Sequence, residues 1–510
     1  MESLTKRILA IALIALLGTG IGIGAWVFIG QEGGIPWETP GVSGIPSNRW
    51  IKVGVLNDIG EIQGDHAWEG TWLAAYNINT DGGVDINGTV YYVAVIAEDT
   101  DEAAPLLDVT KSVSAAQKII HVDGAEYLIG GFRTEALKSY IEVVMDNKII
   151  FLGTGAATDY FAENVVDAYS RYKYFFRTNP HNSTAMGGQI IPFLMYLALW
   201  GLPFQAYMQS IGASPADPYY NTTLPGLYWP GVLPDTRTKN QLNVTQVAIL
   251  REDLDWTIPF AAAIEGNLPG FLNLTKIAYP ITATSEDFTG YINNLQSLGI
   301  QIVIPLISAQ GGIKMMSAYK ALEPNFLIAG VDVQAQTSEY WTDTLGGAAY
   351  EVYSHGFSGL NNTNVTPLTQ AYYDQYWDVW GHAPLYTGSG SYDAVYTLIN
   401  AINVSQSLTT TDIITQLESY DRNNPRINTS VTVQYAATTT VAEGFAGAHD
   451  VVANWPFASI AYGQWQPDGK QYCISTGASS PVSFLAIYPD WVTTGSLMLP
   501  PWGINGLYSL

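Results

Sequence analysis

The chain has 510 residues, of which 47% are hydrophobic, and its 45 acidic against 21 basic residues give a net charge of −24. A chain of this length is expected to fold into two or more domains, because a single core rarely grows beyond about 250–300 residues. The scarcity of Lys and Arg argues against nucleic acid as a partner, since a basic patch is needed for that role. Cys473 is the only cysteine, which excludes a disulfide within the chain.

The N-terminus carries an uncharged apolar segment at 8–29, preceded by Lys6 and Arg7. The segment is long enough to cross a bilayer as a helix, and the basic pair before it places the bulk of the chain outside the cell. A cleaved signal peptide is the alternative, although the apolar run is long for one and no clear cleavage site follows. We expect an uncleaved membrane anchor, followed by a Gly- and Pro-rich spacer at 30–50.

Glycosylation sequons support an extracytoplasmic location, because they serve as acceptors only there. They are Asn87, Asn182, Asn221, Asn243, Asn273, Asn361, Asn364, Asn403 and Asn428. The alternative is that Asn and Thr simply gather in surface turns. The sequons in exposed turns, Asn221, Asn361 and Asn364, are expected to be the most readily modified.

From residue 51 onward the chain alternates predicted strands and helices. In its first part, strands are predicted at 51–59, 91–99, 126–131 and 148–152, and helices at 67–79, 108–120 and 134–147. In a second part, strands are predicted at 246–250, 276–280, 300–306 and 326–331, and helices at 257–266, 286–298 and 312–322. Strands that are apolar throughout are typical of a parallel sheet covered on both faces. The sequence therefore predicts two α/β lobes, with a loop-like insertion at 212–235 between them.

Small and hydroxyl-bearing residues follow two predicted strands of the first lobe. Thr134 begins the helix after strand 126–131, and "GTGAAT" after strand 148–152 ends in Thr158. Ligands of open parallel sheets bind beyond the carboxyl ends of the strands, where helix N-termini offer free N–H groups and a partial positive charge. This combination suits a carboxylate. Helix capping by the two threonines is the alternative, and it is compatible with ligand binding.

Several segments, taken in order, resemble a known family over roughly residues 51–470. They are "IKVGVLNDIGEIQG", "GTWLAAYNINTDGGV", "IGGFRTEA", "FLGTGAATDYF", "EDFTGYINNLQSLGIQIVIPL" and "PLYTGSGSYDAVYTLINAI". Together they resemble the extracytoplasmic solute-binding proteins of branched-chain amino-acid ABC transporters, the leucine/isoleucine/valine-binding type. The resemblance implies two Rossmann-like lobes with a ligand cleft between them, joined by three crossovers. It also implies capture of an amino acid or similar small polar solute by lobe closure, and delivery to an ABC permease.

The resemblance also implies how the chain is divided. Lobe 1 is expected to comprise 51–178 and 355–454, and lobe 2 to comprise 179–354 and 455–510, with crossovers near 179, 354 and 455. In the family, a hydroxyl at the position of Thr134 and the backbone and hydroxyl of Ala156, Ala157 and Thr158 hold the ligand carboxylate. Asp332 matches the acid that holds the ammonium group, Trp256 matches a cleft aromatic, and Gln63 lies in a loop that covers the ligand side chain.

The sequence departs from the family pattern at several of these positions. Arg133 replaces a small residue, and it either pairs a second carboxylate of the ligand or pairs Glu135 or Asp159 within the protein. Ser308 stands where the family has an aromatic residue, which makes the wall more polar than a purely aliphatic ligand requires. Asp332 is one methylene shorter than the usual Glu, and an ordinary turn or N-cap Asp is the alternative interpretation.

No enzymatic function is expected, because the sequence contains no HExxH, CxxC or G-x-S-x-G motif and its histidines show no short metal-ligand spacing. We therefore expect neither a metal nor a cofactor. The alternatives that the sequence leaves open are a sensor ectodomain or a surface protein on the same fold, and a secreted hydrolase.

Overall fold

The computed structural model describes residues 34–198, 244–280, 287–308, 310–421, 424–429, 432–433, 435, 448–451, 460–474, 492–495, 497–502 and 504. Within these ranges no helix combines the length and the apolarity that crossing a bilayer requires. The predicted anchor at 8–29, the insertion at 212–235, and the sequons Asn221 and Asn243 lie outside the described residues.

The first sheet has seven strands in the order β1-β4-β2-β5-β6-β7, with β3 paired to β4. They are β1 Ile35–Glu38, β2 Trp50–Asn57, β3 Val84–Ile86, β4 Thr89–Asp99, β5 Tyr127–Gly130, β6 Ile150–Gly153 and β7 Phe175–Arg177. All are parallel except β1 and β3, which run antiparallel to β4. The sequence predicted an irregular spacer at 30–50. This prediction is wrong for the residues of β1, because β1 pairs with β4 and its Ile35 is buried in the first core.

The second sheet also has seven strands, in the order β16-β15-β12-β11-β10-β8-β9. They are β8 Gln246–Glu252, β9 Asn273–Tyr279, β10 Ile302–Ile307, β11 Leu327–Asp332, β12 Val352–His355, β15 Ala461–Trp465 and β16 Gln471–Cys473. The five from β12 to β9 are parallel, and β15 and β16 are antiparallel additions at one edge. A separate short pair consists of β13 Arg426–Ile427 and β14 Thr432–Val433.

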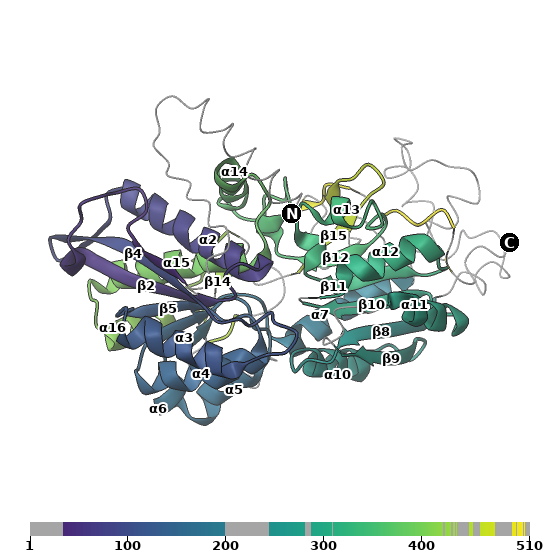
Figure 1. The fold of residues 1–510 in the computed structure, drawn as a ribbon, viewed down its shortest axis with the longest axis horizontal. Coiled ribbons are helices and arrows are strands. Elements are labelled where there is room, and N and C mark those ends of the chain that lie inside the picture. Colours follow the sequence, from purple (N-terminus) through teal and green to yellow (C-terminus); the bar gives the residue numbers. More distant parts are fainter. Residues whose placement is uncertain are drawn as a thin grey trace. The chain divides into compact units, whose positions relative to one another are not determined.

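The helices connect these strands, as Figure 1 shows. In the two chain segments that form lobe 1, the helices are α2 Ile62–Thr80, α3 Val109–His121, α4 Thr134–Asp146, α5 Tyr160–Asp167, α6 Tyr169–Tyr172, α14 Thr369–Trp380, α15 Tyr386–Ser405 and α16 Thr410–Glu418. In lobe 2 they are α7 Ser183–Tyr196, α10 Thr257–Asn267, α11 Phe288–Ser297, α12 Gly312–Leu322 and α13 Tyr340–Asp343. Short 3-10 helices are η1 Ser47–Arg49, η3 Gln334–Gln336 and η4 Phe357–Gly359. The two-lobed α/β fold expected from the sequence is therefore present.

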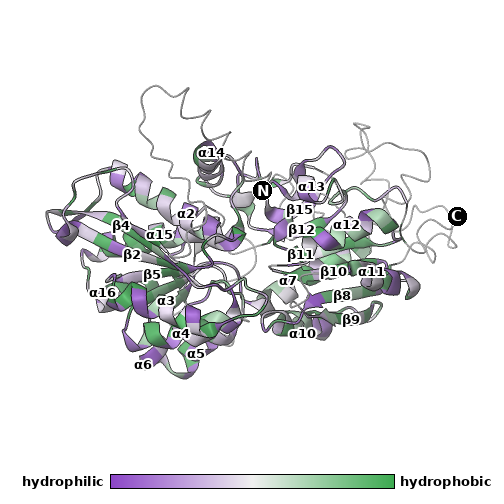
Figure 2. Cartoon of the chain, in the orientation of Figure 1, coloured by the Kyte–Doolittle hydropathy of each residue, from purple (hydrophilic) through white to green (hydrophobic). Residues whose placement is uncertain are grey.

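Each sheet is the centre of its own hydrophobic core, and the strands are the most hydrophobic parts of both lobes (Figure 2). The chain passes from the first core to the second between β7 and α7. The chain then returns to the first core, in which Val395 and Leu398 of helix α15 are buried. Val451 is the last described residue in the first core, and Ile460, the next described residue, lies in the second core. The carboxyl ends of both parallel sheets thus carry the loops from which a ligand site is built.

Helices α2 and α15 lie side by side against the first sheet, and glycines make this close packing possible (Figure 1). A Cβ added at Gly70 of α2 would lie 2.0 Å from the carbonyl oxygen of Gly388 of α15. We therefore expect Gly70→Ala to lower the free energy of unfolding by about 1–3 kcal/mol or more, because the helices would have to move apart. Denaturant unfolding of the variant measures this.

Gly188 in α7 provides the matched control, because a Cβ there meets no atom within 4 Å. Gly188→Ala should be neutral or should stabilise the fold by about 0.5–1 kcal/mol, the usual gain of Ala over Gly in a helix. Equal stability of the two variants would show that the contact between α2 and α15 is not as tight as described.

Candidate ligand-binding site

A cavity of about 100 Å³ lies between the loops that follow the parallel strands of the two sheets. From lobe 1 its walls include Glu102 and Ala103 after β4, Phe132 and Arg133 after β5, and Gly155 and Ala157 after β6. From lobe 2 they include Leu254 and Trp256 after β8, Ser308 and Gln310 after β10, Val331 and Val333 at the end of β11, and Ser354 and His355 of β12. The cavity therefore occupies the place where ligands of open parallel sheets bind.

Some of the residues that the sequence singled out line this cavity and others do not. Arg133, Ala157, Trp256 and Ser308 form part of its wall. Gln63, Thr134, Ala156, Thr158 and Asp332 are all buried but are not part of it. The sequence did not single out Glu102, His355 or Tyr386, which the structure adds to the wall.

The "GAAT" loop is held from behind by Arg177, the last residue of β7. Its guanidinium donates to the carbonyl oxygens of Ala156 and Thr158, and its Nε donates to Asp450 Oδ1 at 2.8 Å, with the Arg177 side chain fully buried. The carbonyl oxygen of Ala157 accepts from Ser183. Among the described residues, no group accepts a hydrogen bond from the backbone N–H of Ala157 or Thr158. The loop thus turns its carbonyls inward and leaves two N–H groups for another partner.

Thr134 and Thr158 differ in what their hydroxyls do. The hydroxyl oxygen of Thr158 accepts from the N–H of Tyr160 at 3.4 Å, a long capping contact at the start of α5. The hydroxyl of Thr134 is buried and has no hydrogen-bond partner among the described residues. Thr158 therefore behaves partly as the capping alternative predicts, whereas the polar group of Thr134 is unused in the protein itself.

Arg133 is bound to the protein on one side only. Its Nε donates to Glu135 Oε2 at 3.2 Å, and its Nη1 donates to the carbonyl oxygen of Ala104 at 2.9 Å. Within the part of the chain that the structure describes, nothing accepts from its Nη2. Pairing within the protein and pairing with a ligand are therefore compatible for Arg133. It pairs with Glu135 and not with Asp159, and it also lines the cavity with Nη2 available as a donor.

Glu102 is the acidic residue in the described cavity wall, and protein donors already occupy both of its oxygens. Oε1 accepts from the hydroxyls of Thr100 and Tyr140 at 2.7 and 3.1 Å. Oε2 accepts from the backbone N–H groups of Phe132 and Arg133 at 2.9 and 2.6 Å. Burial raises the pKa of this carboxyl to about 7. Glu102 thus shapes the loop after β5 and has little capacity left for a ligand.

Two further wall residues have polar atoms that the protein does not use. Trp256 Nε1 and both ring nitrogens of His355 are buried, and none has a hydrogen-bond partner among the described residues. Burial lowers the pKa of His355 to about 3, so the ring is neutral and offers one donor and one acceptor. Buried polar groups are normally paired in folded proteins, so these atoms on the cavity wall are candidates for hydrogen bonds to a bound solute.

Asp332 does not have the position that the resemblance implied for it. It is the last residue of β11, and its carboxylate accepts from the hydroxyl of Tyr340 at 2.9 Å and from the N–H of Gln334 at 3.0 Å. It is fully buried beside Glu351, and burial raises the pKa of both carboxyls. Val331 and Val333 face the cavity, and Asp332 between them points away, because successive side chains of a strand alternate in direction. Its described contacts are those of a structural acid.

Gln63 connects the lobes rather than covering the cavity wall. Its Nε2 donates to the carbonyl oxygen of Ser308 at 2.7 Å. A second contact between the lobes is the ion pair between Lys138 Nζ and Asp255 Oδ2, at 2.8 Å. Beside it, the backbone N–H of Asp255 donates a hydrogen bond to the carboxylate of Glu135. These contacts flank the cavity and hold its two walls together.

Two of the described sequons are buried in this fold. Asn182 is 3% exposed, caps α7 through the N–H of Ala185 and donates to Asp450. Asn428 is 1% exposed. These two sequons, expected from the sequence to carry glycans, are therefore buried where a glycan needs an exposed side chain. The described sequons that are exposed are Asn87, Asn273, Asn361, Asn364 and Asn403.

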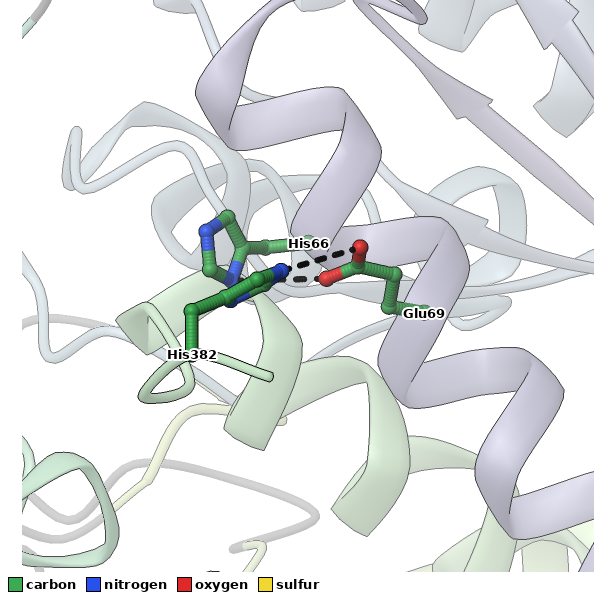
Figure 3. Close-up of side chains that lie close together, drawn as sticks. All are labelled: His66, Glu69 and His382. Atoms are coloured by element: carbon green, nitrogen blue, oxygen red, sulfur yellow. Dashed lines mark ion pairs between the residues drawn. The ribbon is translucent and has the colours of Figure 1, made fainter. Parts of the chain in front are cut away.

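His66, Glu69 and His382 form a cluster (Figure 3), and none of the three lines the cavity. Its candidate metal-ligand atoms lie within 4.8 Å of one another, with 3.4 Å between His382 Nε2 and Glu69 Oε1. The lone pair of His66 Nδ1, however, already accepts from the N–H of Leu385 at 3.1 Å, and the hydroxyl of Tyr376 lies 2.8 Å away. The cluster therefore joins α2 to the segment between α14 and α15, which spacing along the sequence did not reveal.

Two buried acids should make the fold less stable as the pH rises above neutral. Burial, reinforced by the charge of Glu102, raises the pKa of Asp58 to about 8, and burial raises that of Glu102 to about 7. In an unfolded chain these pKa values are about 3.9 and 4.3. The folded chain therefore binds more protons, and the resulting stabilisation is complete below about pH 4 and is lost as the pH rises through 7 and 8.

We expect the melting temperature to fall between about pH 6.5 and 8.5, and to fall less for Glu102→Gln. The histidines with lowered pKa, His66 and His355, oppose this trend only below about pH 6.5, where they gain protons in the unfolded chain. Thermal melts across this window provide the measurement. A melting temperature that rises with pH would contradict the assignment of these two acids.

The fold and the cavity together define a two-lobed α/β protein with a cavity between its lobes. The chain belongs to the periplasmic binding protein family, since the model of that family matches residues 51–444. This confirms the resemblance inferred from the sequence. A comparison with curated protein sequences finds no match.

Solved structures of the same fold come from several ABC transporters. One is the branched-chain amino acid transporter substrate-binding protein LivJ of Streptococcus pneumoniae in complex with isoleucine, at 12% identity and a TM-score of 0.58 over 82% of this chain and 97% of that one. The leucine-binding protein LivK of Thermotoga maritima has 12% identity and a TM-score of 0.55 over 82% and 97%. An ABC transporter solute-binding protein of Rhodopseudomonas palustris in complex with benzoate has 12% identity and a TM-score of 0.55 over 82% and 94%.

Proposed function

We propose that this chain is an extracytoplasmic solute-binding protein that captures a small solute with a carboxylate and an apolar body, and delivers it to an ABC importer. The observation that carries the proposal is the cavity between the two lobes, whose wall combines apolar side chains with hydrogen-bond donors that the protein does not use. Sites of this composition, with a few placed polar groups in an apolar pocket, are typical of small-molecule binding. The family of the chain and the amino-acid and aromatic-acid ligands of similar structures support it.

A thermal-shift screen of the full chain against amino acids, carboxylic acids and amides tests the proposal. A solute present at a hundredfold its dissociation constant should stabilise the fold by about 2.7 kcal/mol. The solute so identified should stimulate ATP hydrolysis by the reconstituted ABC permease only in the presence of this chain. If no small solute stabilises the protein, the proposed function is wrong.

We further propose that the segment at 8–29 is retained as a membrane anchor and that exposed sequons carry glycans, Asn361 and Asn364 first among them. Peptide mapping of the native protein from a membrane fraction should therefore recover the N-terminal segment, and should find added hexose at these sites. A mature chain that begins beyond Gly30, or unmodified peptides at both sites, would contradict the respective part of this prediction.

A further inference from the structure

We infer that the solute is a monocarboxylic acid without an α-ammonium group, with a branched aliphatic or aromatic body, and not an amino acid. This inference rests on the proposed function and specifies its ligand. It comes from a count of which polar groups on the cavity wall have partners within the protein and which do not.

Four hydrogen-bond donors on the wall have no partner among the described residues. On the lobe 1 side they are the backbone N–H of Ala157 and Nη2 of Arg133, and on the lobe 2 side they are Nε1 of Trp256 and one ring nitrogen of His355. All four residues line the same cavity. A carboxylate accepts up to about four hydrogen bonds and carries the charge that complements the guanidinium, so these donors match its requirements.

An ammonium group finds no equivalent partner on the described wall. It requires acceptors and a formal negative charge, because an unpaired charge in a water-poor site is strongly destabilised. Four protein donors occupy the oxygens of Glu102, and its pKa of about 7 makes it partly neutral at physiological pH. Asp332, the acid expected to hold the ammonium, points away from the cavity into its contacts with Tyr340 and Gln334. The side-chain amides of Asn179 and Gln310 offer acceptors there, but neither is charged.

Apolar side chains form a large part of the wall and determine which body of the acid fits. Met186, Leu254, Val331, Val333 and Tyr386 contribute to it, together with the rings of Phe132 and Trp256. Burial of an aliphatic or aromatic group against these side chains supplies affinity in proportion to the apolar area removed from water. The ligand class is therefore a carboxylate at one end and a hydrocarbon at the other.

Matched pairs of ligands that differ only in the α-ammonium group test this inference by calorimetry on the full chain. The pairs are 4-methylpentanoate with leucine, and 3-phenylpropanoate with phenylalanine. In at least one pair the acid should bind roughly thirtyfold or more tightly than the amino acid, because the amino acid must leave its ammonium unpaired. The amide of the better acid, which lacks the negative charge, should bind more weakly than the acid by roughly tenfold or more.

The outcomes separate this inference from the function on which it rests. If leucine or phenylalanine binds more tightly than its acid, the inference is overturned and the proposed solute-binding function stands. If none of the acids, amino acids or amides in the screen binds, the proposed function itself fails.

His355→Leu provides a second, independent measurement. It removes two buried nitrogens that have no partner in the protein, so the melting temperature of the empty protein should stay the same or rise. Binding of the acid should weaken by roughly tenfold or more, since one donor to the carboxylate is lost. A lower melting temperature with unchanged affinity would make His355 a structural residue and would remove it from the site.

Discussion

Arg133→Gln is expected to weaken binding of a carboxylate ligand by roughly thirtyfold or more. The reason is that Arg133 is the cation of the described cavity wall whose guanidinium has a nitrogen, Nη2, without a protein partner. Truncating one member of a buried charge pair costs about 2–5 kcal/mol, because the other charge is left unpaired. Calorimetry with the identified solute measures the loss.

Arg171→Gln is the matched control, because Arg171 pairs with Glu142 and Asp146 on the surface of lobe 1 and does not line the cavity. Exposed ion pairs contribute about 0–1 kcal/mol, so this variant should keep its affinity. Equal affinities of the Arg133 and Arg171 variants would show that the guanidinium at 133 serves Glu135 and Ala104 alone.

Asp332→Ala should have the opposite pattern, a less stable fold with unchanged affinity. Its removal leaves the buried hydroxyl of Tyr340 and the N–H of Gln334 without their acceptor, which costs about 1–3 kcal/mol for each unsatisfied group. The carboxylate does not line the cavity, so ligand affinity should stay within about threefold of the parent. Denaturant unfolding and calorimetry on the same preparation measure both quantities.

Asp343→Ala controls for the loss of an acid in the same region, since Asp343 ends α13 and is exposed. It should change neither stability nor affinity appreciably. If Asp332→Ala instead loses affinity strongly while its stability matches that of the control, Asp332 holds an ammonium group after all. The ligand would then be an amino acid.

The sequence by itself determined the alternation of strands and helices and the strand ends at which the cavity lies. The apolar strands and the amphipathic helices between them are local patterns, and strand and helix periods of about 2 and 3.6 residues are legible without tertiary information. Chain order then placed "GTGAAT" and Trp256 at the carboxyl ends of strands, where Ala157 and Trp256 do line the cavity. The expected spacer was misjudged because its Gly and Pro content conceals the four residues of β1, which pair only when β4 is beside them.

The tertiary structure alone decided which side chains at those ends meet the cavity. Asp332 is the neighbour of Val331 and Val333 in the sequence, and neighbouring side chains of a strand point to opposite faces. A shift of one residue along the strand would therefore exchange the side chains that face the cavity. Whether Asp332 faces a ligand or Tyr340 therefore depends on how β11 is seated, and no local pattern records it.

Partners far apart in the sequence were equally inaccessible from it. Arg177 supports the "GAAT" loop through an ion pair with Asp450, and His355 enters the cavity from β12 as a lone histidine without a motif. Burial determines the neutrality of His355 and the raised pKa of Glu102, and burial is set by how the two lobes pack. The sequence thus indicated the strand ends at which the cavity lies, whereas the polarity of the cavity wall arises only from the packing of residues distant along the chain.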